Sequence, residues 1–124
     1  MQKMITLLFL VAGIIHLMPI TGVFGPDKLN TLYGLSFNEP NLQILMRHRA
    51  ILFGLLGSLL VYAAFRPEIQ IIALIGGLLS ATSFLVIAWS TGGYNEAITK
   101  IVIADVVATV SLLIAALLLA MHKR

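Results

Sequence analysis

The sequence predicts an all-α protein, an integral membrane four-helix bundle, and three observations lead to that prediction. Of the 124 residues, 60% are hydrophobic and only 10% are charged, against roughly 25% charged residues in a typical soluble domain. The mean hydropathy is +1.03. The apolar residues gather in four runs of about 20, the length that crosses a hydrocarbon core about 30 Å thick. We therefore expect a single transmembrane domain over residues 1–124.

The predicted helices are near residues 4–24, 44–65, 69–89 and 98–121. Lys3 before the first run resembles the start of a signal peptide, but His16 interrupts the run and TGVFG ends it, so a retained helix is expected. Pro67 suits the first turn of the third helix. Asn95 suits the N-cap of the fourth helix.

The longest connection, residues 25–41, allows two interpretations. Pro26, Leu29, Leu32 and Tyr33 have near-helical spacing and precede Gly34, which favours a short interfacial helix ending at that glycine. The same stretch is also polar enough to be an ordinary loop. The sequence alone leaves both open.

Ionisable groups on three helices are expected at similar depth, on the side of the long connection. His16 lies about 18 Å beyond Met4, just past the middle of the bilayer. Asp105 lies about one turn inside the membrane, again on the side of the long connection. The 16 residues from Ala50 to Phe65 reach only about 24 Å, which draws Arg49 and its neighbours to the membrane edge or slightly below it.

The candidate ligand-binding or ion-pair residues are therefore His16, Arg47, Arg49 and Asp105. A carboxylate and a guanidinium at one depth can pair, so Asp105 is expected to bridge to Arg49 or Arg47. The two arginines are two positions apart and project about 200° from each other, so only one can face the bundle axis. The alternatives are that the arginines are interfacial anchors, that the bridge only fixes helix register, and that His16 bonds a neighbouring backbone group or hydroxyl.

Composition and motifs exclude several function classes. The net charge of +3 is spread over helix ends and loops, which argues against nucleic-acid binding. Without cysteine, thiolate metal sites, iron–sulfur clusters and a cysteine nucleophile are ruled out. A pair of haem-ligating histidines at matching depth is not evident, because His48 lies near the surface beside arginines. No catalytic motif is present, so we expect no catalytic residues, no metal and no resident cofactor other than a bound lipid or quinone.

Positive charges do not decide the orientation of the chain. Four spans place both termini on one side, and lysine and arginine are balanced four to four. If the two arginines of the second helix belong to a site, the termini are expected in the cytoplasm. The terminal side has Lys3, Arg66, Lys123 and Arg124, and the other side has Lys28, Arg47, Arg49 and Lys100.

Three stretches resemble a known family: LLFLVAGIIHLMPITGVFG, then LYG in the polar connection, then LMRHRAILFGLLGSLLVYAAFRP. Together with the Asp105-bearing fourth helix, they are similar to the DoxX-like group of small four-helix bacterial membrane proteins. The resemblance implies a multi-pass bundle in the cytoplasmic membrane, association with redox enzymes, and a quinone-linked or lipid-linked role. It implies no catalytic residue.

The leading functional hypothesis is a lipid-binding or quinone-binding protein or accessory subunit, with a polar intramembrane site on the long-connection side. One alternative is a proton-coupled small multidrug-type transporter, although His16 stands where such transporters have a glutamate. The other is a purely structural subunit. Membrane lipid, a membrane protein partner or a second copy of the chain are the expected partners.

Overall fold

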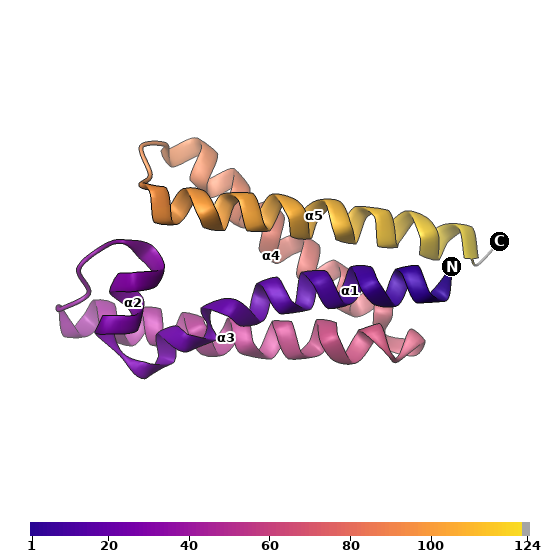
Figure 1. The fold of residues 1–124 in the computed structure, drawn as a ribbon, viewed down its shortest axis with the longest axis horizontal. Helices are drawn as coiled ribbons and strands as arrows, with labels where there is room; N and C mark the ends of the chain where they lie inside the picture. Colours follow the sequence, from indigo (N-terminus) through magenta and orange to yellow (C-terminus); the bar gives the residue numbers. More distant parts are fainter. Residues whose placement is uncertain (123–124) are drawn as a thin grey trace.

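The computed structural model describes residues 1–122 and consists of helices only. Lys123 and Arg124, counted above among the charges of the terminal side, lie outside the described residues. The long helices run up and down, so that both termini lie at one end of the molecule (Figure 1). In chain order the elements are α1 (Gln2–Leu17), η1 (Met18–Phe24), α2 (Pro26–Tyr33), α3 (Pro40–Ala64), η2 (Pro67–Ile69), α4 (Gln70–Thr91) and α5 (Glu96–His122).

Four segments of the described chain are long and apolar enough to cross a membrane: Gln2–Phe24, Pro40–Ala64, Pro67–Thr91 and Glu96–Met121. Large apolar side chains such as Leu55, Leu79 and Leu117 are exposed around the bundle, as expected where lipid is the solvent. The chain is therefore a multi-pass membrane protein. The predicted all-α four-helix bundle is confirmed.

The helix bounds differ from the predicted ones at positions where local chemistry overrides hydropathy. The second span begins at Pro40 rather than near residue 44, because the Glu39 carboxylate accepts hydrogen bonds from the backbone N–H groups of Asn41 and Leu42 and caps the helix. The first span becomes a 3₁₀ helix from Met18, next to Pro19, whose ring removes a backbone donor and disfavours the preceding α-helical turn.

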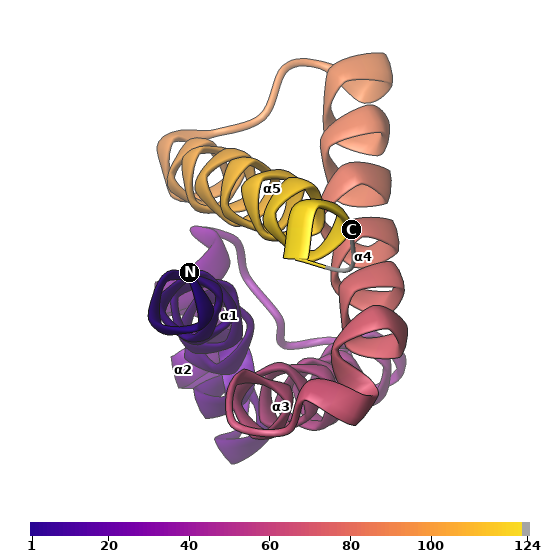
Figure 2. The same ribbon diagram turned by 90° about the vertical axis from the view of Figure 1, so that its right-hand side faces the viewer.

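Seen end-on, the long helices surround a common axis in the order α1, α3, α4, α5 (Figure 2). Neighbours in this order pack against one another, whereas α3 and α5 lie across the bundle. The main core is built from apolar side chains of all four long helices, including Phe9, Leu60, Ala73 and Leu112.

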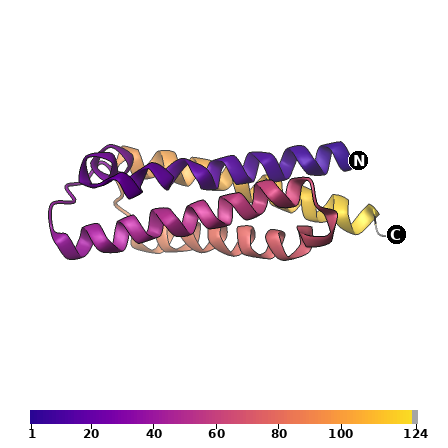
Figure 3. The same ribbon diagram turned by 90° about the horizontal axis from the view of Figure 1, so that it is seen from below.

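The short helix α2 settles the question of the long connection. It ends at Gly34, which has a φ of 64°, a left-handed conformation that glycine adopts without steric cost. Leu29, Tyr33 and Phe37 form a second apolar cluster with Ile98 and Ile101 of α5. The helix thus covers the end of the bundle opposite the termini (Figure 3).

Candidate functional site

His16 is a buried junction between α1 and α4. Only 1% of it is exposed. Its Nδ1 donates to the carbonyl oxygen of Ala12 at 2.8 Å, and its Nε2 lies 3.1 Å from the hydroxyl oxygen of Ser80. In the neutral ring this arrangement places the proton on Nδ1, so that Nε2 accepts from the serine. The histidine therefore has the backbone and hydroxyl partners that the sequence left as one alternative.

Arg47 and Arg49 point in different directions, as their helical spacing predicts. Arg47 is exposed, and its Nε donates to the carbonyl oxygen of Val23 at 2.8 Å. Arg49 turns inward, and its Nε donates to the hydroxyl oxygen of Tyr33 at 3.4 Å. Arg49 is consequently the arginine that can serve a site inside the bundle.

Three aromatic rings surround the guanidinium of Arg49. Its Cζ lies 4.4 Å from the ring centroid of Phe53, 5.7 Å from that of Phe84 and 5.9 Å from that of Tyr33. These rings come from α3, α4 and α2, and each attracts the cation through its negative face. Within residues 1–122, the two terminal nitrogens of Arg49 have no hydrogen-bond partner. The cage holds the charge in place while leaving these donors available.

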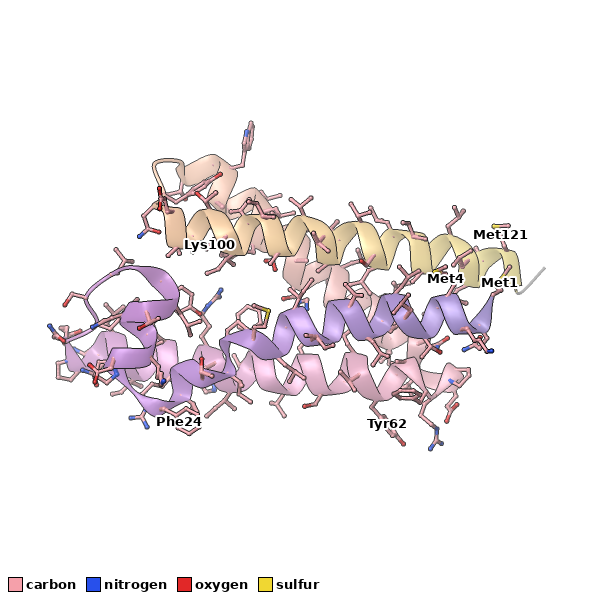
Figure 4. All side chains as sticks on the ribbon, viewed as in Figure 1. Met1, Met4, Phe24, Tyr62, Lys100 and Met121 are labelled. Carbon is pink, nitrogen blue, oxygen red and sulfur yellow. The ribbon has the colours of Figure 1, made fainter. Side chains whose placement is uncertain are left out.

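A cavity of about 270 Å³ lies beside this cage, and we call it the inner cavity. Most of its wall is apolar and comes from α1, η1, α2, α3 and α5. Lys100 of α5 lies at the α2 end of the bundle, opposite Met1 and Met121 (Figure 4). The polar residues of the wall are Thr31, Tyr33, Arg49, Lys100 and Asp105.

Asp105 faces the inner cavity without a protein partner. Only 6% of it is exposed, and its carboxylate makes no hydrogen bond or ion pair with any residue from 1 to 122, where the only ion pair found is Arg66–Glu68. The expected bridge from Asp105 to Arg49 or Arg47 is thus not formed. The reason is geometric, because α3 and α5 lie across the bundle from each other and the guanidinium of Arg49 contacts three aromatic rings instead.

The three inward ionisable residues lie at one depth. His16, Arg49 and Asp105 are 14 to 16 residues from the terminal-side ends of their spans, or about 21 to 24 Å at 1.5 Å per residue. Arg49 and Asp105 line the same cavity, whereas Arg47 does not. His16 does not line this cavity, but its ring contacts Phe53, which also contacts Arg49. The ring centroids of His16 and Phe53 lie 5.8 Å apart.

Asn95 fastens α2 over the inner cavity. Its Oδ1 accepts from the backbone N–H of Ile98 at 2.8 Å, which confirms the predicted cap of the last helix. Its Nδ2 donates to the carbonyl oxygens of Tyr33 at 3.0 Å and Gly34 at 3.3 Å. One side chain therefore starts α5 and also holds the end of α2.

Sequence reasoning missed the aromatic and lysine components of the site. Tyr33 was visible only as one apolar position of a candidate helix, and Phe53 and Phe84 are indistinguishable in sequence from lipid-facing residues. Lys100 entered only the count of positive charges on the long-connection side, although it lies in the predicted fourth helix five residues before Asp105. Among residues 1–122, no group of three or more His, Cys, Asp or Glu side chains could hold a metal ion.

Comparison with protein-family models, curated proteins and solved structures finds no match for this chain. The resemblance to the DoxX-like group therefore rests on the residues quoted for it and identifies no family.

Proposed function

We propose that this protein binds the head of a quinone-like molecule, a lipid-soluble ring bearing two oxygen substituents, in the inner cavity. The observation that carries the proposal is the buried carboxylate of Asp105, which has no hydrogen-bond or ion-pair partner among residues 1–122. It shares its cavity with the guanidinium of Arg49, whose terminal nitrogens are equally without a hydrogen-bond partner in that part of the chain. A buried charge without a partner costs several kcal/mol. A ligand that bonds to both groups would remove that cost.

The volume of the cavity favours a head group whose tail lies elsewhere. About 270 Å³ is just below the range of roughly 300 to 1,000 Å³ in which whole drug-sized ligands are bound. The head of an amphipathic molecule fits this volume, because its hydrocarbon tail stays in the bilayer.

The polar groups match both redox forms of such a ring. Arg49 and Lys100 donate hydrogen bonds, as carbonyl oxygens of the oxidised form require, and the carboxylate of Asp105 accepts from a hydroxyl of the reduced form. The chain itself offers no thiol, and its described part offers no metal site. The role we propose is therefore binding and delivery to a membrane redox enzyme, in line with the DoxX-like resemblance.

The test is to purify the full chain and to quantify co-purifying quinones and lipids by mass spectrometry. Asp105→Asn and Arg49→Gln are expected to lower the quinone content about tenfold or more, the loss that follows from removing a charged hydrogen bond of about 1.5 to 3 kcal/mol. Arg47→Gln is the matched control, because this arginine does not line the cavity. Circular dichroism and size-exclusion chromatography verify folding.

Unchanged quinone content in both cavity variants would contradict the proposal. A loss of phospholipid instead of quinone would assign the cavity to a lipid. Proton-gradient-driven uptake of a cation into vesicles would favour the transporter hypothesis. That hypothesis needs access from both sides, and the terminal half of the bundle is filled by core side chains such as Ile5, Leu60 and Leu119.

We further propose that the protein lies in the cytoplasmic membrane with both termini in the cytoplasm. Arg49 contacts three aromatic rings and lines the inner cavity, so we count it with the binding site and not among the orienting charges. Lys28, Arg47 and Lys100 then remain on the long-connection side, against four positive charges on the terminal side. The positive-inside rule places the richer side in the cytoplasm.

A further inference from the structure

A second hollow lies on the other side of Arg49, between α3 and α4, and we call it the outer groove. It has a volume of about 330 Å³ and is lined by Leu45, Met46, His48, Arg49, Leu52, Phe53, Leu56 and Ser80. It arises because α4 leaves α3 and crosses toward α5 at this end of the bundle (Figures 1 and 2). Only Arg49 and Phe53 also line the inner cavity.

The outer groove opens toward the lipid. Leu45, His48 and Leu52 on its wall are exposed, and their helix is one of the membrane-spanning segments. An open groove on such a face is in contact with bilayer lipid, because no water is available there to fill it.

The polarity of the groove changes with depth. His48 and Arg49 lie near the long-connection end, while Leu52 and Leu56 lie one and two turns deeper along α3, about 5 and 10 Å further into the membrane. Neither Asp nor Glu lines the groove. A phospholipid has the same order of groups, with an anionic phosphate at the edge of the bilayer and acyl chains beneath it.

We infer that the outer groove is a binding site for an anionic phospholipid of the surrounding bilayer. The terminal nitrogens of Arg49, which have no partner within residues 1–122, donate to two phosphate oxygens in the bidentate manner typical of arginine. The imidazole of His48 donates to the same headgroup, and one acyl chain lies along Leu52 and Leu56. Ser80 takes no part in headgroup binding, since its hydroxyl is bonded to His16.

The experiment compares retention of dioleoyl phosphatidylglycerol with that of dioleoyl phosphatidylcholine by native mass spectrometry of the delipidated full chain. We expect the wild type to retain about fivefold more of the anionic lipid, and His48→Ala and Leu52→Trp to remove this preference. Because His48 is exposed, its replacement leaves folding intact even if the tryptophan variant fails to fold. Arg47→Gln is the matched control and keeps the preference, because Arg47 lines neither hollow.

Equal retention of the two lipids by the wild type would overturn the inference, as would an unchanged preference in His48→Ala. Loss of the preference in Arg47→Gln would also overturn it, since the effect would then be one of surface charge. If millimolar inorganic phosphate displaces the lipid, the groove recognises free phosphate and the lipid assignment is wrong. The two proposals share Arg49, and two variants outside that residue distinguish them. Asp105→Asn changes only the inner cavity, and His48→Ala changes only the outer groove.

Discussion

At the scale of single residues, a glycine sets the distance between α1 and α3. A Cβ on Gly57 would lie 2.9 Å from the backbone nitrogen of Leu17 and 2.7 Å from its Cγ. Backbone cannot move aside as a flexible side chain can, so this position requires the absence of a side chain. The close approach in turn brings His16 next to Phe53 on the facing helix.

We expect Gly57→Ala to destabilise the protein by about 1 to 3 kcal/mol, the usual cost of overpacking a core. The measurement is the free energy of unfolding in mixed micelles with increasing dodecyl sulfate. Gly76→Ala is the matched control, since its added Cβ would meet only Leu56 Cδ1 at an ordinary 3.4 Å. A neutral Gly57→Ala would show that the two helices are not held at this distance.

The bond between His16 and Ser80 gives a second expectation at this scale. Ser80→Ala leaves Nε2 of a buried imidazole without its partner, at an expected cost of about 0.6 to 1.7 kcal/mol, as for other hydrogen bonds inside membranes. The same unfolding assay measures this cost, with the exposed Ser83→Ala as control.

The tautomer of His16 is a separate expectation. Nitrogen NMR of His16 should show the Nδ1–H form in the neutral ring. The Nε2–H form would contradict the bond to Ala12.

At the scale of elements, α2 is the part of the fold that closes the inner cavity, and few bonds hold it. Its own hydrogen bonds span eight residues, and isolated helices of that length are marginal in water. Its attachment therefore depends on packing against η1, on the apolar cluster around Tyr33, on the bond from Arg49 to the Tyr33 hydroxyl and on the two bonds donated by Asn95.

Asn95→Asp separates the two roles of this side chain. The carboxylate still caps α5 by accepting from Ile98, but it cannot donate to the carbonyl oxygens of Tyr33 and Gly34. We expect faster hydrogen exchange in residues 26–37 and unchanged exchange in the first turns of α5. Asn38→Asp, in the exposed part of the same connection, is the control. Equal protection of α2 in both variants would show that Asn95 does not fasten it.

At the scale of the whole molecule, two arguments about the site differ in how far they reach. The depth of each residue in the membrane can be estimated from its position along a helix, whereas the pairing of opposite charges cannot. The common level of His16, Arg49 and Asp105 follows from helix rise and alternating direction, and counting along the observed spans gives the same level. The partner of Asp105 could not be predicted in this way. Depth says nothing about which helices are neighbours, and the pairing fails because α3 and α5 lie across the bundle.

The components that sequence reasoning missed depend on rotation about the helix axis. Phe53 lies four residues after Arg49 on the same face of α3, so helical spacing alone predicts this neighbour. Phe84 reaches Arg49 from α4, and the low contrast between the faces of an apolar helix hides this contact. Glu39 and Asn95, by contrast, act within their own helix ends, where local sequence is sufficient. The N-cap of α5 was accordingly predictable from Asn95. The start of α3 was predicted from hydropathy alone, which places it near residue 44, whereas the capping residue Glu39 places it at Pro40.

The orientation of the molecule is the prediction that joins these scales, because it depends on Arg49 belonging to a binding site rather than acting as an orienting charge. The chain has no cysteine, so a single introduced cysteine is the only target of a maleimide. We expect a membrane-impermeant maleimide to label Ser36→Cys in intact cells and to label Gln2→Cys only after permeabilisation, both positions being exposed. In Arg49→Gln the pattern should persist, since the positive-inside rule then counts the same surface charges as before. Labelling of Gln2→Cys in intact cells would show that the termini lie outside the cytoplasm and would contradict the proposed orientation. A labelling pattern that changes in Arg49→Gln would show that the charge of Arg49 helps to set the orientation.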